Sequence, residues 1–188
     1  MSFLKHCKEQ GLIDLTAFDK LSLFADLILQ WNPRINLTGF KTREPLEEVL
    51  LGEAILALPH LGLTGEQILD FGSGAGIPGL VWAICRPAIA LTSLESRHKK
   101  VAFQKEAARV LSLQAEILAG RFPEQVAMRQ FDVIVSRAIR FSPSLWNEAE
   151  MLLRAGGRLV RFMKAQEPPP GWATFSLSSR AALAVRKV

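Results

Sequence analysis

From residue 67 onward, short apolar runs alternate with segments of helical character, and this alternation constrains the fold more than any other feature of the chain. The apolar runs predict strands at residues 67–71, 89–94, 115–118, 131–136 and 158–163. The segments between them predict helices at about 77–85, 97–111, 122–128 and 143–154, the last ended by Gly156-Gly157. Two closing strands are expected at 172–177 and 181–186. This order predicts an α/β fold, a mostly parallel seven-stranded sheet with helices on both faces.

The N-terminal part of the chain predicts helices instead of strands. Apolar side chains recur every three or four residues over 18–31, after a capping box at Thr16-x-x-Asp19 and before Pro33, which we expect to end the helix. A second helix is expected over 45–58. We therefore divide the chain into an N-terminal helical extension, residues 1–58, and a Rossmann-like domain, residues 59–188.

The charges of the chain are unevenly distributed. The net charge of the chain is +5. Residues 1–69 carry six Lys or Arg and nine Asp or Glu, a net charge of −3, whereas residues 70–188 carry 17 Lys or Arg and nine Asp or Glu, a net charge of +8. A basic segment of this size is typical of proteins that bind a polyanion. A solvated basic face without a partner is the alternative.

Simple counts exclude several classes of protein. Cys7 and Cys85 cannot make a disulfide framework and suit a reducing compartment. The start of the chain is charged by its fifth residue, and no apolar run approaches the roughly 18 residues of a membrane span. The three histidines lie far apart, without Cys or acidic partners at metal-ligand spacing. We therefore expect a cytoplasmic protein with no membrane segment and no metal.

A glycine-rich loop runs from Asp70 to Gly79, between the first predicted strand and the helix that follows it. Doubly wound sheets bind ligands at this place, where the helix N-terminus offers free amides. The spacing Gly74-x-Gly76-x-x-Gly79 matches the dinucleotide-binding fingerprint. The spacing Asp70-x-Gly72-x-Gly74-x-Gly76 instead resembles the first motif of Rossmann-like methyltransferases, which bind S-adenosylmethionine (SAM).

The chemistry of the two ligands favours SAM. SAM carries a cationic amino group and a sulfonium, which Asp70 would attract, whereas the same carboxylate would repel a pyrophosphate. Glu95 follows Gly74 by 21 residues and is placed to accept ribose hydroxyls, but both cofactors contain ribose. A glycine-rich turn without any ligand is the third interpretation.

Several further motifs carry a resemblance over nearly the whole chain. They are Trp31-Asn32 with Asn36-Leu37-Thr38, the loop ending Gly76-Ile77-Pro78-Gly79, Glu95-Ser96-Arg97 with Lys99-Lys100-Val101-Ala102-Phe103, and Ser136-Arg137-Ala138. In these motifs the chain resembles the RsmG or GidB family, which methylates N7 of a guanosine in small-subunit (16S) ribosomal RNA. The resemblance implies a SAM-dependent class I methyltransferase and a small-subunit ribosomal RNA partner. We further expect a monomer.

The resemblance also implies a set of cofactor-binding residues. Together with the loop residues Asp70, Gly74 and Gly76, it assigns this role to Gly72, Ile77, Glu95, Ser96, Arg97, Phe122, Pro123 and Arg137. Phe122 and Pro123 are aligned only by their distance from the Ser-Arg-Ala motif. No catalytic base is assigned, because guanine N7 has a lone pair and no proton. Candidates for RNA phosphate contacts near the carboxyl ends of the strands are Arg97, Lys99, Lys100, Arg137, Arg140, Arg158, Arg161 and Lys164.

The chain departs from the family in one segment. Where the family reads Arg-His-x-x-Asp-Ser, this chain reads Gly52-Glu53-Ala54-Ile55-Leu56-Ala57, without that His and Asp. This departure keeps open a SAM-binding or RNA-binding relative without transferase activity. The dinucleotide fingerprint keeps open an NAD(P)-dependent oxidoreductase.

Overall fold

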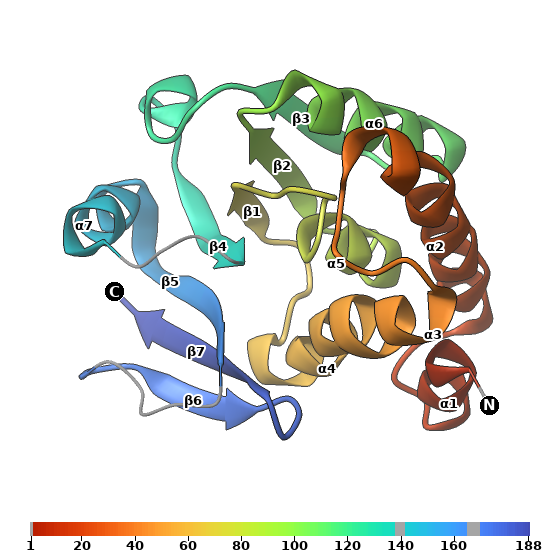
Figure 1. The fold of residues 1–188 in the computed structure, drawn as a ribbon. Coiled ribbons are helices and arrows are strands. Elements are labelled where there is room, and N and C mark those ends of the chain that lie inside the picture. The colour runs from red at the N-terminus through yellow and green to blue at the C-terminus, as the bar shows by residue number, and fades with distance from the viewer. Residues whose placement is uncertain (1, 138–141, 165–169) are drawn as a thin grey trace.

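The sheet of the computed structural model, which describes residues 2–137, 142–164 and 170–188, has seven strands in the order β3-β2-β1-β4-β5-β7-β6 (Figure 1). The strands are β1 (Gln67–Phe71), β2 (Ala90–Glu95), β3 (Ala115–Ala119), β4 (Phe131–Arg137), β5 (Leu153–Lys164), β6 (Ala173–Ser176) and β7 (Ala181–Lys187). Strands β1 to β5 are parallel, and β7 pairs antiparallel with both β5 and β6. The predicted α/β class and the mostly parallel seven-stranded sheet are confirmed.

Helices lie on both faces of this sheet (Figure 1). They are α1 (Phe3–Glu9), α2 (Leu15–Ile35), α3 (Arg43–Pro45), the π-helix η1 (Leu46–Leu51), α4 (Gly52–Leu61), α5 (Gly79–Cys85), α6 (His98–Val110), the 3-10 turn η2 (Glu124–Val126) and α7 (Pro143–Met151). Alternate residues of the strands enter two cores. Ile68 and Val133 pack with Phe24 of α2 and Trp82 of α5, whereas the core on the opposite face includes Trp146 of α7.

Both predicted boundaries of the first long helix are wrong. The N-cap of α2 is Asp14, whose side chain accepts a hydrogen bond of 2.7 Å from the backbone N–H of Ala17, so the box at Thr16-x-x-Asp19 does not cap the helix. The helix then passes through Pro33 and ends at Asn36, which adopts a left-handed conformation with φ of 52°. A proline near a helix end removes one hydrogen bond from an exposed turn, and its cost there is small enough to be tolerated.

The second helix also extends beyond its predicted limits. Helical structure begins at Arg43, before Pro45, and continues through η1 and α4 to Leu61. Pro59 lies inside α4, and the end of the helix is set by Gly62, which has a φ of 56°. A left-handed glycine is a common helix C-terminus, and here it overrides the proline signal.

Strand β5 begins five residues earlier than predicted. Gly156 and Gly157 lie within this strand, close to an irregularity in its pairing with β4, and α7 has already ended at Met151. The helix expected over 122–128 is only the single turn η2. Ala138, Arg140 and residues 165–169 lie outside the described residues. Within the described part of the chain, no helix combines the length and apolar character needed to cross a membrane.

Candidate functional site

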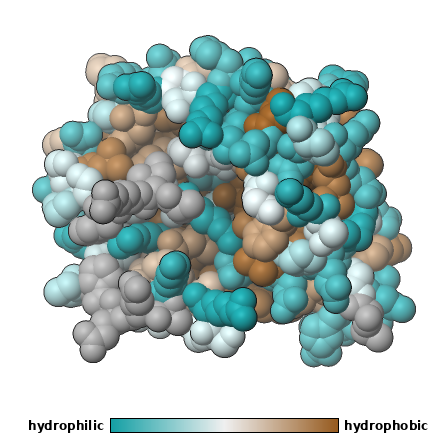
Figure 2. Space-filling model, viewed as in Figure 1, coloured by the Kyte–Doolittle hydropathy of each residue, from teal (hydrophilic) through white to brown (hydrophobic). Residues whose placement is uncertain are grey.

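A cavity of about 430 Å³ lies at the carboxyl ends of β1, β2 and β4. Its lining comes from the glycine loop, the start of α6, the end of β4 and two N-terminal segments: Leu37, Thr38, Leu50, Gly72, Ser73, Gly74, Ala75, Ile77, Glu95, Ser96, Arg97, Lys100 and Arg137. The structure therefore brings together seven of the predicted site residues. Figure 2, in the view of Figure 1, shows hydrophilic and hydrophobic residues interspersed over this side of the molecule.

The glycine loop has a shape that side chains would prevent. Gly74 and Gly76 have φ angles of +62° and +80°, in the left-handed region that L residues rarely adopt. A Cβ on Gly76 would also lie 2.4 Å from Cδ1 of Leu80 on α5. Gly74 has no such neighbour, and its backbone faces the cavity. The loop thus exposes its backbone to the cavity at Gly74, whereas at Gly76 it packs tightly against Leu80 of α5.

Asp70 lies beneath this loop and does not line the cavity. Its side chain is completely buried, and Oδ2 accepts a hydrogen bond of 2.8 Å from the N–H of Gly79, the first residue of α5. Oδ1 has no hydrogen-bond partner among the described residues. Burial raises the pKa of Asp70 to about 7. The structure therefore gives Asp70 a role in anchoring the start of α5.

Glu95 connects the end of β2 to the glycine loop. Its Oε2 accepts a hydrogen bond of 2.8 Å from the N–H of Gly74, and its Oε1 accepts one of 2.8 Å from the N–H of Arg97. The residue is 6% exposed and still lines the cavity. Its carboxylate is thus fixed in position and can accept further hydrogen bonds from a ligand.

The glycine loop is also held by Gln104 of α6, which the sequence analysis missed. The amide Nε2 of Gln104 donates to Oγ of Ser73 at 2.8 Å and to the carbonyl of Gly74 at 2.9 Å, and its Oε1 accepts from Ser93 at 2.7 Å. Gln104 is fully buried on the helix face that also carries Val101. The sequence does contain a signal for this role, because Gln104 is a polar residue at a position of α6 where the helical spacing otherwise places buried apolar side chains.

Arg137 joins the end of β4 to the N-terminal helices. Its guanidinium lies 2.5 Å from the carboxylate of Glu53 and donates to the carbonyls of Leu50 at 3.1 Å and Val49 at 3.2 Å. Burial lowers the pKa of Arg137 and raises that of Glu53, and the attraction between the two charges opposes both effects. Glu53 belongs to the segment that departs from the family and does not itself line the cavity, so, among the described residues, this segment contacts the site only through Arg137.

Phe122 lines a second cavity, of about 370 Å³, that adjoins the first. Gly72 and Ser96 line both cavities, and the ring of Phe122 stacks on Phe71 with 4.5 Å between centroids. Neither cavity is lined by Gly76 or Pro123. Eight of the eleven predicted residues thus line one of the two cavities, and Asp70, Gly76 and Pro123 line neither.

The segment after α2 forms one wall of the first cavity, and Asn32 holds it in place. The side chain of Asn32 donates to the carbonyl of Phe40 at 2.8 Å and accepts from the N–H of Thr38 at 2.9 Å. These bonds bring Leu37 and Thr38 to the cavity. The Trp-Asn and Asn-Leu-Thr motifs therefore have a common structural purpose.

Comparison with known proteins identifies the family. The model of the family described as rRNA small subunit methyltransferase G matches residues 17–177. The chain belongs to this family. It is 38% identical over 159 residues to the ribosomal RNA small subunit methyltransferase G of Syntrophotalea carbinolica, covering 82% of this chain and 71% of that protein. It is 35% identical to the methyltransferase G of an Anaeromyxobacter species, covering 89% of this chain and 79% of that protein.

Solved structures support the fold of this methyltransferase G family member. A methyltransferase from Pyrococcus furiosus has a TM-score of 0.63 at 15% identity, and the match covers 90% of this chain and 98% of that one. The 16S rRNA N2 G1207 methyltransferase RsmC of T. thermophilus, solved with AdoMet and guanosine, has a TM-score of 0.59 at 20% identity, covering 72% of this chain and 42% of that one.

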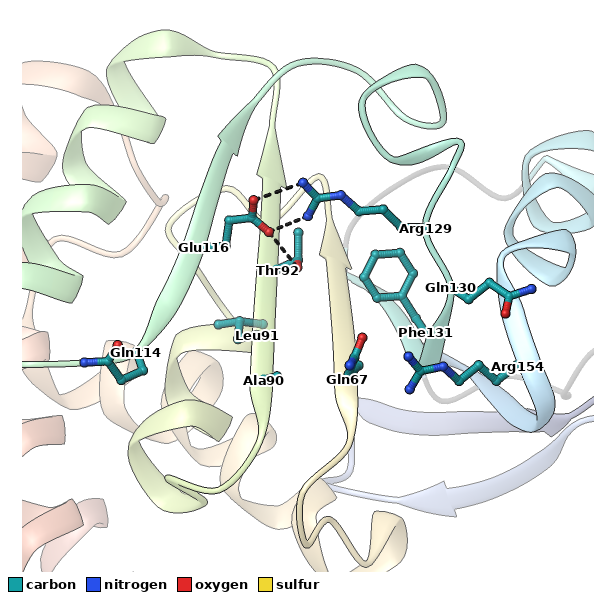
Figure 3. A pocket seen from close by; sticks show the side chains of 10 residues that line it. All are labelled: Gln67, Ala90, Leu91, Thr92, Gln114, Glu116, Arg129, Gln130, Phe131 and Arg154. Atoms are coloured by element: carbon teal, nitrogen blue, oxygen red, sulfur yellow. Dashed lines mark hydrogen bonds and ion pairs between the residues drawn. The ribbon is translucent and has the colours of Figure 1, made fainter.

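Another cavity, of about 510 Å³, lies at the amino ends of the strands, opposite the candidate site (Figure 3). Its lining comes from the first residues of the strands, and Glu116 pairs there with Arg129 and accepts from Thr92. It contains none of the predicted site residues. Because ligands of open α/β sheets bind outside the carboxyl ends of the strands, this cavity is not the candidate site.

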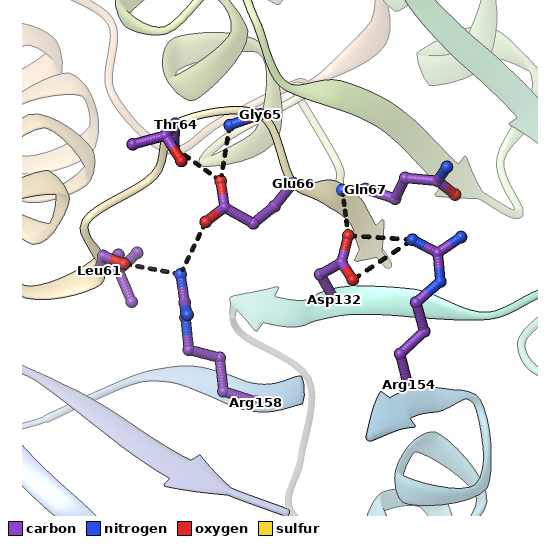
Figure 4. Close-up of polar contacts among 8 residues, drawn as sticks. All are labelled: Leu61, Thr64, Gly65, Glu66, Gln67, Asp132, Arg154 and Arg158. Atoms are coloured by element: carbon purple, nitrogen blue, oxygen red, sulfur yellow. Dashed lines mark hydrogen bonds and ion pairs between the residues drawn. The ribbon is translucent and has the colours of Figure 1, made fainter. Parts of the chain in front are cut away.

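Arg158 was expected near the carboxyl ends of the strands, and this expectation is wrong. It donates to the carbonyl of Leu61 at 2.6 Å and lies 3.5 Å from Glu66, beside the pair formed by Arg154 and Asp132 (Figure 4). Because β5 begins early, residue 158 is in the middle of the strand and pairs with Val133. Arg158 therefore contributes to the structure of the sheet edge opposite the candidate site.

Proposed function

We propose that this member of the methyltransferase G family transfers the methyl group of SAM to N7 of a guanosine in 16S ribosomal RNA. The observation that carries the proposal is the cavity at the carboxyl ends of β1, β2 and β4, which contains the glycine loop, Glu95 and Arg137 of the family motifs. Family membership leaves the oxidoreductase hypothesis with no supporting observation beyond the glycine spacing.

The residues around the two adjoining cavities suit the parts of SAM. Glu95 presents a fixed carboxylate to the ribose hydroxyls, and the loop backbone at Gly74 allows close approach of a ligand. The aromatic ring of Phe122, next to Gly72 and Ser96, offers a flat apolar surface for the adenine. Asp70, Gly76, Ile77, Arg97, Pro123 and Arg137 complete the proposed binding residues, with Asp70 and Gly76 acting through the shape of the loop.

The chemistry requires orientation more than proton transfer. Bound SAM would supply an activated methyl group. The lone pair of guanine N7 would form the new N–C bond as the S–C bond breaks and S-adenosylhomocysteine leaves, so no residue has to remove a proton. The protein must align N7 with the methyl carbon and sulfur and exclude water. Alignment of this kind contributes roughly 7–11 kcal/mol to rate acceleration in favourable cases. The walls formed by Leu37, Leu50 and Ile77 are apolar and suit this purpose.

The target guanosine should be unpaired or distorted. N7 lies in the major groove, which in A-form RNA is too deep and narrow for side chains to enter. The base must therefore lie in a loop or bulge, or leave the stack, to reach the cavity. Arg97, Lys99 and Lys164 are exposed at the carboxyl edge of the sheet and are available to phosphates. We expect the protein to act as a monomer in the cytoplasm.

The decisive experiment is transfer of a labelled methyl group from SAM to naked 16S ribosomal RNA, to small subunits and to protein, followed by nucleoside mass spectrometry. The proposal predicts 7-methylguanosine in RNA or subunits. SAM binding without transfer to any substrate would support the inactive relative instead. The segment that departs from the family contributes Glu53, whose carboxylate pairs with the cavity residue Arg137.

A further inference from the structure

Among the residues that the structure describes, three cations line the cavity, and they differ in their availability. Arg137 is occupied by Glu53 and by the carbonyls of Val49 and Leu50. Arg97 is exposed to solvent at the rim. Lys100 is half-buried, and its side-chain ammonium has no hydrogen bond or ion pair with any residue that the structure describes. Lys100 is therefore the inner cation with a free charge.

Lys100 stands beside the part of the glycine loop that faces the cavity. Its Nζ lies 3.8 Å from the position that a Cβ on Gly74 would take. It belongs to the first turn of α6, where no acidic side chain is present and where the helix dipole disfavours a cation. An unpaired ammonium at a helix N-terminus, partly withdrawn from water, is a favourable place for an anionic group of a ligand.

We propose that Lys100 binds the α-carboxylate of the methionine part of SAM; this assignment rests on the proposed function. The carboxylate is the anionic group of SAM and has to reside in the same cavity as the loop. An RNA phosphate is the other anion available, but the exposed Arg97 and Lys99 lie nearer to solvent and are better placed for it. Arg137, the other inner cation, already has three acceptors.

The test compares ligands that differ in one group. Decarboxylated SAM retains the amino group, sulfonium, ribose and adenine and lacks only the carboxylate. Calorimetry should show that the wild-type protein binds decarboxylated SAM at least tenfold more weakly than SAM. Lys100→Gln should weaken SAM and S-adenosylhomocysteine at least tenfold, and should change the affinity for decarboxylated SAM less than twofold. The matched control is Lys105→Gln, which removes an exposed lysine from the same helix and should leave all three affinities unchanged.

Each other outcome overturns the assignment. If Lys100→Gln weakens all three ligands equally, the lysine only shapes the loop. If it weakens RNA binding and leaves SAM binding intact, its anion is a phosphate. If the wild-type protein binds SAM and decarboxylated SAM equally well, no residue binds the carboxylate, and the assignment is wrong although the proposed function still holds. If the wild-type protein binds no SAM at all, the proposed function fails as well, so the two failures are distinguishable.

Discussion

Gly74 has a left-handed backbone, and its φ of +62° rather than a lack of space makes a side chain unfavourable there. A β-branched residue in this region costs on the order of 1–3 kcal/mol, so Gly74→Val should distort the loop and move the N–H that Glu95 binds. We expect the affinity for SAM to fall at least tenfold, as measured by calorimetry. Gly156→Val is the control, because Gly156 has a φ of +77° and open space but lies in β5. It should lose similar stability and keep SAM affinity; normal SAM binding by Gly74→Val would remove the loop from the site.

Asp70 makes the stability of the protein depend on pH. Its pKa is about 7 in the folded protein against 3.8 for the free side chain, so the folded state binds more protons between these values. The contribution of Asp70 to stability is therefore greatest below pH 4 and is lost as the pH rises to 7, by at most about 1.4 kcal/mol per pH unit. Asp70→Asn cannot ionise and should gain stability relative to the wild type over this range. Urea unfolding at several pH values measures the difference; parallel curves for both proteins would contradict the assignment.

At the residue scale, the sequence predicted the contacts that are local and missed those that are not. The loop residues from Gly72 to Ile77 follow one another in the chain, and their spacing carries the signal. Glu53 and Arg137 are 84 positions apart, and Gln104 is 31 positions from Ser73. Only the packing of helices on the sheet brings such pairs together.

At the scale of elements, the ion pair of Arg137 and Glu53 connects β4 to α4. The two side chains are 15% and 10% exposed, so removing either leaves a buried charge without its partner. Arg137→Ala and Glu53→Ala should each cost about 3–5 kcal/mol of unfolding free energy, and the double variant should cost clearly less than their sum.

Chemical denaturation of the four proteins measures this coupling energy. The matched control is the pair of Arg154 and Asp132, at the opposite end of β4, whose side chains are 42% and 32% exposed. Exposed pairs are screened by solvent, so its coupling should stay below about 1 kcal/mol. A coupling near zero for Arg137 and Glu53 would mean that the bond is not a link between the two elements.

Apart from the helix expected over 122–128, which is a single 3-10 turn, the predicted elements were correct in type and least accurate at their ends. Pro33 and Pro59 predict helix ends, but both are accommodated within the last turns of α2 and α4, and the left-handed residues Asn36 and Gly62 end these helices instead. Gly156-Gly157 predicts a break, yet the sheet accommodates both residues in β5. A local signal sets a boundary only when tertiary packing does not outweigh it.

For the whole molecule, periodicity predicted the number and nature of the strands but not their order. Neighbours such as β1 and β4, which pair Leu69 with Ile134, are far apart in sequence, and no local pattern encodes their contact. The alternation of strands and helices predicted a mostly parallel sheet, and the order of its strands follows from pairing that only the folded chain shows. The basic character of residues 70–188 is a property of the same scale, because it belongs to no single element.

This charge distribution leads to a prediction about RNA binding. Cations that contact phosphates release counterions, so the logarithm of RNA affinity should fall linearly with the logarithm of salt concentration, by about 0.7 in slope for each phosphate contact to single-stranded RNA. Lys99 is exposed at the start of α6, and Lys99→Gln should lower the slope by about one such contact. Lys105→Gln removes the same charge farther along the helix and should leave the slope unchanged. Filter binding to 16S ribosomal RNA over a salt series measures all three proteins. A flat response of the wild type would mean that its basic residues are a solvated face and that its substrate is not a polyanion.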